Sequence, residues 1–253
     1  MNREAAVLLG GGRALLLQVA HPLVAAGVAA HSHFRERPLE RLWRTLDLML
    51  TMVFASAAEA IRAVRAIERV HAQVHGTLDA DVGPFPRGTP YDANDPSLLL
   101  WVHATLVDSA LLCYELLVER LAAPVKSVYY EESKIAARLL GIPEDLIPRT
   151  LDAFEGYMRG LLASDVLAVG PASREIAASI LRPPVFVGLR PAFAVANLFT
   201  VALLPPVLRE RYALSWGAGW ETAVQTMAHA SRLFLPLLPR FVRFFPHARH
   251  AVR

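Results

Sequence analysis

Hydrophobic residues recur at three- and four-residue intervals along most of the chain, which is the spacing of α-helices. The stretch 57–75 is expected to form one amphipathic helix that Gly76 ends. Its apolar side is expected to carry Ile61, Val64, Ile67, Val70 and Val74. The alternation typical of strands is found only weakly, at 184–189. The pattern therefore predicts an all-α fold.

Prolines, glycines and capping residues divide the pattern into successive helices. A helix that begins at Arg13 is predicted to break at His21-Pro22, and Pro38 suits the first turn of the next helix. A loop at 77–95 precedes a long helix that we expect from Asp95-Pro96 through Leu121. Further helices are predicted at 126–140, 144–163, 171–181, 191–203, 206–213 and 217–235.

The chain of 253 residues contains no internal repeat, so a single compact multi-helix domain is predicted over 1–239. A tail of arginine, histidine and aromatic residues, 240–253, follows it. Hydrophobic residues make up 54% of the chain and charged residues 19%, which favours a large core, an apolar cavity or contact with a membrane.

Two stretches, 14–34 and 191–208, lack Asp, Glu, Lys and Arg and approach the length of a membrane span. Both contain polar residues and prolines, so buried helices are favoured and peripheral membrane contact is the alternative. The net charge of +3 is too small to indicate nucleic-acid binding. The one cysteine, Cys113, excludes an internal disulfide and fits a cytoplasmic location.

Histidines are the most informative polar residues. Six of the nine fall in the first 110 residues: His21, His31, His33, His71, His75 and His103. On one predicted helix, His71 and His75 would share a face and could chelate a metal, but no glutamate stands between them as in zinc proteases. Glu68 precedes His71 by three residues, the spacing of di-iron sites, but the chain has no second copy of that motif.

Three further groups carry two interpretations each. His103 lies in an apolar helix and is either a neutral iron ligand or a core histidine bonded to a carbonyl. Arg41, Arg44 and Thr45 share a helix face and either bind an anionic group or form a solvated surface. Cys113 is conceivable as a thiolate haem ligand, but a small buried apolar role is favoured.

Several strings occur in a specific order between residues 13 and 220, and their order resembles one known family. They are QVAHPLVAAGV at 18–28, HSHFR at 31–35, RLWRT at 41–45, VHAQVHG at 70–76, YDANDP at 91–96, LWVHAT at 100–105, and LLPP at 203–206 followed by Arg209 and Tyr212. The set resembles the mpaB-type oxygenases, a family that includes the latex clearing proteins or rubber oxygenases.

The resemblance implies an all-helical fold and a haem b whose iron is held by a single histidine. In the rubber-cleaving members, an arginine-x-x-basic-threonine motif precedes the ligand by about thirty residues. Arg41, Arg44 and Thr45 resemble that motif and would line the haem pocket with Thr105. His71 is then the best-placed axial ligand. His75 and His103 are the alternative ligands.

The sequence departs from the rubber oxygenases at one point: no glutamate stands between Glu4 and Glu36, upstream of the arginine motif. His21 is the candidate base in its place. The leading hypothesis is a haem b oxygenase that uses dioxygen on an apolar, isoprenoid or lipid-like substrate. The alternatives are a non-catalytic haem or lipid carrier and a non-haem metal enzyme that uses His71 and His75.

Overall fold

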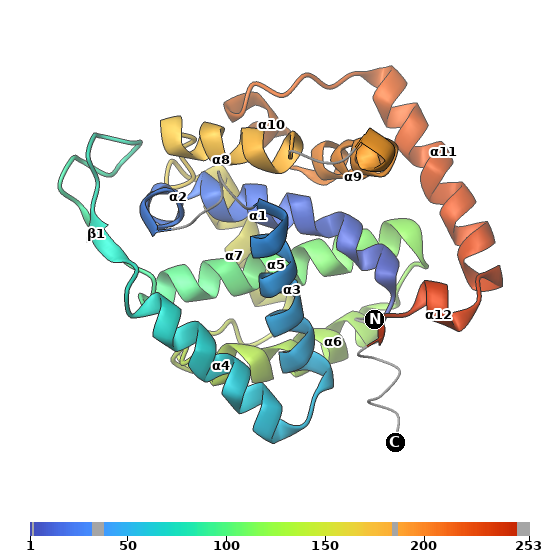
Figure 1. Ribbon diagram of the computed structural model, residues 1–253, viewed down its shortest axis with the longest axis horizontal. Helices are drawn as coiled ribbons and strands as arrows, with labels where there is room; N and C mark the ends of the chain where they lie inside the picture. The colour runs from blue at the N-terminus through green and yellow to red at the C-terminus, as the bar shows by residue number, and fades with distance from the viewer. Residues whose placement is uncertain (2, 32–37, 184–186, 247–253) are drawn as a thin grey trace.

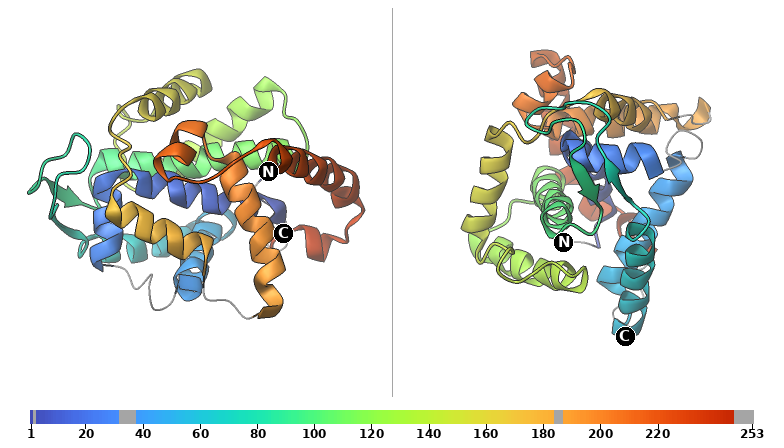
Figure 2. Two further views of the ribbon diagram at one scale, coloured as in Figure 1. Left: turned by 90° about the horizontal axis from the view of Figure 1, so that it is seen from above. Right: turned by 90° about the vertical axis from the view of Figure 1, so that its left-hand side faces the viewer.

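Helix α5 (Pro96–Leu117) runs through the middle of the computed structural model, and the other helices surround it (Figures 1 and 2). The structure describes residues 1, 3–31, 38–183 and 187–246, with the side chains of all but 38–45 and 187. Within this part of the chain, twelve α-helices and one sheet of two short strands confirm the predicted all-α class.

Helix α5 forms because its start is capped and nearly every side chain that follows is apolar. The Asp95 carboxylate accepts hydrogen bonds from the backbone N–H groups of Ser97 and Leu98, and Pro96 occupies the first turn. The helix ends at Leu117, four residues before the predicted end. It is the one described helix long and apolar enough to cross a membrane, yet 67% of its most apolar window is buried, as expected of a core helix.

The first helical segment bends sharply, as the His21-Pro22 dipeptide predicted. Helix η1 (Ala5–Gly10) continues into α1 (Gly11–Ala20), and α2 (Pro22–His31) leaves at 103° to this pair. His21 itself is extended, and its Nδ1 accepts a hydrogen bond of 3.3 Å from the N–H of Leu23. The described part of the apolar stretch 14–34, residues 14–31, is therefore not one straight span.

Helices α3 (Pro38–Phe54) and α4 (Ala57–His71) pack on each other. Ser56 and Glu59 form a capping box at the start of α4. The buried side of α4 is made of Ala60, Ala63, Val64 and Ile67, whereas Ile61 and Val70 are exposed. The predicted apolar side was therefore partly wrong, because Ile61 and Val70 lie about 180° apart around the helix axis and flank the buried side on opposite edges.

The chain leaves the helix after His71, four residues before the predicted end. Strand β1 (His75–Thr77) pairs antiparallel with β2 (Pro90–Asp92), within the stretch predicted to be loop. A further hydrogen bond of 2.9 Å joins the Ala93 N–H to the Val74 carbonyl. The hairpin lies at the left edge of Figure 1.

Most helices of the second half follow the predicted ranges within a few residues. They are α6 (Ala123–Leu139), α7 (Leu151–Ala163), α8 (Pro171–Leu181), α9 (Arg190–Leu203), α10 (Pro206–Arg211) and α11 (Ala218–Phe234), with η2 (Val187–Leu189), η3 (Leu235–Leu237) and α12 (Arg240–Arg243). Helix α7 begins seven residues late because Thr150 caps it. The weak strand prediction is wrong at 187–189, which form a 3-10 turn, and 184–186 lie outside the described residues.

A buried arginine joins the central helices. Arg13 is 4% exposed, and its guanidinium donates to the Leu203 carbonyl and the Ser109 hydroxyl, both at 2.7 Å. It also pairs with Asp108 at 2.6 Å. These contacts fix α1 against α5 and α9. The neighbouring Gly12 is required because a Cβ there would collide with Thr200 of α9.

The start and the end of the described chain meet. Glu4, 1% exposed, accepts hydrogen bonds from the Arg243 guanidinium, the shortest at 2.7 Å. The Phe245 N–H donates to the Arg3 carbonyl at 3.0 Å. The described part of the predicted tail, 240–246, is thus packed on the N-terminal segment.

The two adjacent glycines of α1 provide a matched test of this packing. Gly11→Ala should raise the free energy of unfolding by up to about 1 kcal/mol, because a Cβ there meets nothing within 4 Å and alanine favours helix. Gly12→Ala should lower it by about 1–3 kcal/mol through the collision with Thr200. Chemical denaturation of both variants measures this, and equal effects would contradict the packing.

Candidate functional site

The β-hairpin gathers the histidine-bearing segments at one end of the molecule. Pairing of His75 with Asp92 brings the end of α4 next to the start of α5. Helix α2 packs here as well, since a Cβ on Gly27 would contact Val74 and Tyr91. The right-hand view of Figure 2 faces this end of the fold. His21 lies beside Phe85 of the hairpin loop and His71 lies near Asp92, whereas His103 lies two turns into α5 from Asp95.

His21 lies at the corner between α1 and α2 and is 7% exposed. Its ring centroid is 5.3 Å from that of Phe85, in the loop between the two strands. Burial lowers the pKa of His21 to about 4, and the nearby Asp95 opposes this effect only in part. Because Nδ1 accepts the Leu23 N–H, the proton of the neutral ring lies on Nε2. In this state the Nε2–H of His21 can donate a hydrogen bond, and Nδ1 is already engaged as an acceptor.

His71 is the last residue of α4 and is half-buried. It follows Ile67 by four residues, so it extends the buried side of the helix by one turn. Burial lowers its pKa below the usual value, and Asp92 works in the opposite direction. The imidazole is therefore neutral at pH 7, the form that binds metal ions.

His103 lies in α5, is 8% exposed, and has its pKa lowered to about 4 by burial alone. Its Nε2 has no hydrogen-bond partner within the described part of the chain, where the only other such buried side-chain atom is the Ser173 hydroxyl oxygen. An unpaired buried polar group costs about 1–3 kcal/mol. The core-histidine alternative, in which a carbonyl satisfies this ring, is not supported at Nε2.

Thr105 faces a different side of α5. Its hydroxyl donates to the Val102 carbonyl at 2.7 Å and accepts from the Gln18 side-chain amide at 3.1 Å. The Trp101 indole also donates to the Gln18 carbonyl, at 3.4 Å. Residues 103 and 105 are separated by about 200° around a helix, so Thr105 contacts α1 and His103 does not share that face.

His75 does not join His71 on a helix face, which corrects the predicted chelating pair. It is exposed and begins β1, while its carbonyl lies 3.2 Å from Nε2 of His31. The Tyr91 hydroxyl is 3.4 Å from the same nitrogen. Among the described residues, no group of three His, Cys, Asp or Glu side chains is placed to hold a metal ion.

The remaining predicted site residues are those of the arginine motif, His33 and Cys113. Arg41, Arg44 and Thr45 belong to α3, but their side chains lie outside the described residues, as does His33. Cys113 is fully buried, and burial raises its pKa to about 12, so it is a thiol and not a thiolate ligand.

The aromatic residues of the hairpin were missed by the sequence analysis. Phe85 lies beside His21, and Tyr91 is 8% exposed between α2 and Gly76. The segment is rich in Asp, Gly and Pro, which hides its two three-residue strands. Large aromatic side chains inside such a polar loop were the only available signal that it packs on the core.

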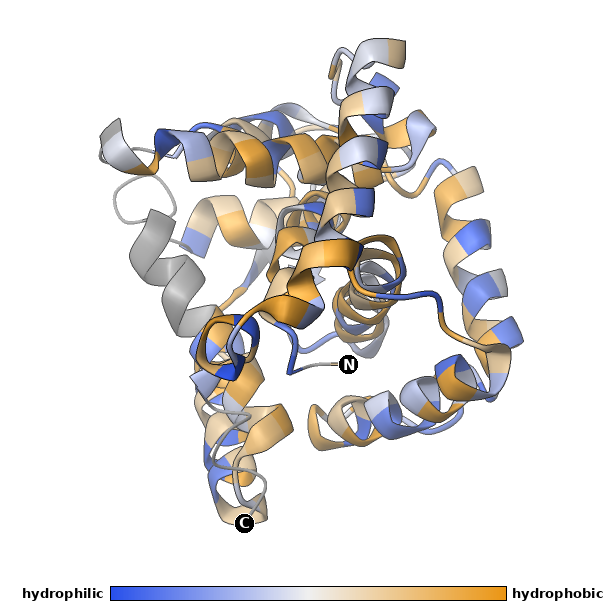
Figure 3. Ribbon diagram, turned by 90° about the vertical axis from the view of Figure 1, so that its right-hand side faces the viewer, coloured by the Kyte–Doolittle hydropathy of each residue, from blue (hydrophilic) through white to orange (hydrophobic). Residues whose placement is uncertain are grey.

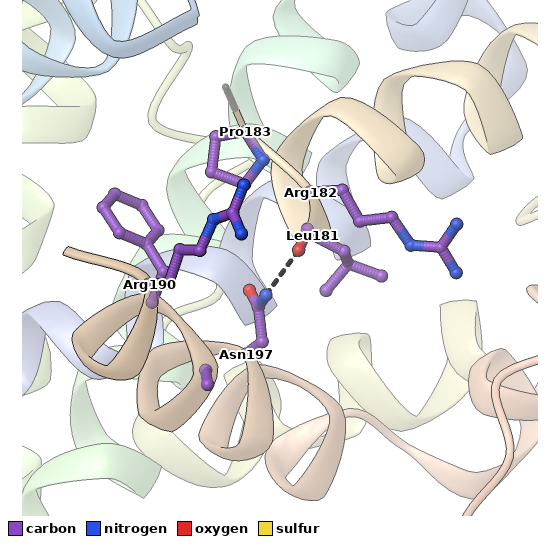
Figure 4. Close-up of a pocket in the computed structure, with 7 residues that line it drawn as sticks. Leu181, Arg182, Pro183, Arg190 and Asn197 are labelled. Atoms are coloured by element: carbon purple, nitrogen blue, oxygen red, sulfur yellow. Dashed lines mark hydrogen bonds between the residues drawn. The ribbon is translucent and has the colours of Figure 1, made fainter. Parts of the chain in front are cut away.

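A separate hollow of about 310 Å³ lies between the end of α8 and the start of α9 (Figure 4). The Asn197 side-chain amide donates to the Leu181 carbonyl within it. Its lining is Leu181, Arg182, Pro183, Arg190, Phe193, Ala194 and Asn197. None of these is a histidine, cysteine or carboxylate, so this hollow offers no iron ligand.

Comparisons with known proteins place these features in a family. The family model described as "ER-bound oxygenase mpaB/B'/Rubber oxygenase, catalytic domain" matches residues 1–233. Two similar proteins are "Uncharacterized protein Mb2261" of Mycobacterium bovis and "Uncharacterized protein Rv2237" of Mycobacterium tuberculosis. Each is 26% identical over 235 residues, which cover 89% of this chain and 87% of the relative. No solved structure gives a significant match.

Burial of His103 predicts a specific loss of stability in acid. Because its folded pKa is about 4, the unfolded chain binds more protons between about pH 4 and 6.5, and stability falls as the pH drops through this range. From pH 7 to 5, His103 should account for about 2 kcal/mol of the lost free energy of unfolding. Denaturant titrations of the cofactor-free protein measure this.

The variant His103→Leu should lose correspondingly less stability over the same interval. His75→Leu is the matched control, since its ring is exposed, and it should behave as the wild type does. Parallel pH profiles for the wild type and His103→Leu would contradict the burial of a neutral imidazole.

Proposed function

Because the chain belongs to the mpaB/B'/rubber oxygenase catalytic-domain family, we propose that it is a haem b-dependent oxygenase that acts on an apolar, isoprenoid or lipid-like substrate. The family consists of oxygenases, which supports oxidoreductase chemistry. The bound haem would supply the iron that activates dioxygen. The protein itself would contribute the side chains that hold the haem and the substrate.

The observation that carries the proposal is the buried, unpartnered Nε2 of His103. A neutral imidazole without a protein partner is what a porphyrin site requires of its histidines. We propose that His71 would hold the iron, because it is also neutral and follows the RLWRT motif by about the thirty residues that the resemblance implies. His103 then offers its Nε2 to the bound group as a hydrogen-bonding partner.

An apolar wall beside His103 suits an apolar substrate. Leu99, His103, Leu106 and Ala110 lie on one face of α5 by their three- and four-residue spacing. Leu106 and Ala110 are only half-buried, so this face is not fully covered by the described side chains. The wall would exclude water and hold a hydrocarbon chain next to His103.

We propose that His21 orients the corner between α1 and α2 and does not act as a base. Its Nδ1 is engaged by the Leu23 N–H, and a pKa of about 4 makes it a weak base at neutral pH. The Nε2–H remains a hydrogen-bond donor. From the sequence alone, His21 was the candidate base in place of the missing glutamate. We now propose a structural role for it at the α1–α2 corner instead.

A non-catalytic haem or lipid carrier is the second candidate. The absence of a glutamate between Glu4 and Glu36, with His21 a weak base, favours it. Both candidates share the haem site and differ in turnover. The non-haem alternative that pairs His71 with His75 is disfavoured, because β1 carries His75 away from the helix.

Reconstitution with haem b tests the cofactor. The purified protein should bind haem and give a Soret band. His71→Ala should lose this band, and added imidazole should restore it. His75→Ala, four residues further along and exposed, is the matched control and should retain haem. His103→Ala should retain haem with a shifted band. No Soret band in the wild type would contradict the proposal.

Oxygen consumption separates the oxygenase from the carrier. The haem-loaded protein should take up oxygen when an unsaturated terpenoid is added, and Leu106→Asp should reduce uptake at least tenfold by placing a charge on the apolar wall. The Soret band of this variant should be unchanged. Haem binding without substrate-dependent oxygen uptake would favour the carrier.

A further inference from the structure

Six large apolar side chains are exposed between the end of helix α11 and α12, over ten successive residues. We call this set the C-terminal apolar surface. Its members are Leu233, Phe234, Leu237, Leu238, Phe241 and Val242, with exposed fractions of 57, 63, 76, 40, 68 and 50%. Figure 3 views the molecule from this side. We propose that this surface inserts into the interface of an anionic lipid bilayer.

The surface is built by interruption of the helix. Pro236 and Pro239 end the regular α-helical run, so η3 and the short α12 replace a continuous helix. Successive turns then direct apolar side chains outward instead of burying every third or fourth one. An exposed apolar cluster of this kind is unusual in a soluble chain and marks an interaction site.

The surface rests on fixed contacts beneath it. The Arg232 guanidinium donates to the carbonyls of Leu116 and Glu115, at 3.0 and 2.7 Å, and the Ser231 hydroxyl donates to the Leu117 carbonyl at 2.9 Å. On the other side, Arg243 is held by buried Glu4. The apolar side chains are therefore presented by a segment anchored to the core helix at one end and to the N-terminus at the other.

The charge of this part of the chain complements anionic lipid. From Thr222 to Pro246 the chain contains three arginines, Arg232, Arg240 and Arg243, and no aspartate or glutamate. Arg243 is neutralised by Glu4, but Arg232 bonds only to uncharged carbonyls and Arg240 is exposed beside Phe241. Basic residues next to aromatic and aliphatic side chains are the composition of interfacial membrane anchors.

A second copy of the chain fits this surface less well. A two-fold contact would place the same basic segment of both copies together, so that the exposed Arg240 of each copy would lie near a like charge. In a bilayer, anionic headgroups would attract these arginines, and the acyl region would bury the apolar side chains. The inference depends only on residues 222–246 and does not require that haem is bound.

Co-sedimentation with vesicles tests the inference. The full chain should bind vesicles of phosphatidylcholine with one quarter phosphatidylserine and bind pure phosphatidylcholine more weakly. The double variant Leu237→Ser/Phe241→Ser should lower the partition coefficient roughly tenfold or more, because two large apolar side chains lose their contact with lipid. Arg240→Gln should lower it by about fivefold on the anionic vesicles only.

A matched pair on α6 provides the control. Val128 and Ile135 are 57 and 58% exposed, on a helix that carries acidic residues, and Val128→Ser/Ile135→Ser should bind vesicles as the wild type does. Circular dichroism should give the same helix content for all variants. Unchanged vesicle binding by Leu237→Ser/Phe241→Ser would overturn the inference. So would a dimer in sedimentation velocity that this variant abolishes, with no vesicle binding by the wild type.

Discussion

The ion pair of the buried Arg13 with the half-buried Asp108 is the contact on which the arrangement of the helices depends. A guanidinium taken out of water is stable only when its N–H groups are satisfied, and here the Ser109 hydroxyl and the Leu203 carbonyl complete the set. The contact fixes the position of α1 along α5. It therefore also fixes His21, at the end of α1, relative to the His103 side of α5.

Local signals in the sequence were sufficient for most helix boundaries. Proline and the Asp95 cap placed the start of α5, and the His21-Pro22 dipeptide placed the bend, because both act through neighbouring backbone groups. The end of α4 was misplaced because His75–Thr77 pair with Pro90–Asp92, about fifteen residues away. Three-residue strands are too short to show the apolar–polar alternation by which strands are recognised. The Arg13 contacts with Leu203 are likewise a product of tertiary folding.

The sequence identified the residues of the candidate site but not how their side chains are arranged. Histidine content singled out His21, His71 and His103, but only the fold separates a capping imidazole from one whose Nε2 is unpaired. Thr105 carries the same lesson: two positions from His103 in the sequence, it contacts Gln18 on another side of α5. Burial explains why the imidazoles of His21 and His103 are neutral.

The central claim is that the neutral imidazole of His71 binds haem iron. Resonance Raman spectroscopy of the ferrous, haem-loaded protein tests it directly when the histidines carry ¹⁵N. The account predicts an iron–histidine stretching band that moves to lower frequency with the isotope and disappears in His71→Ala. A band that is missing in the wild type, or that does not respond to the isotope, would contradict it.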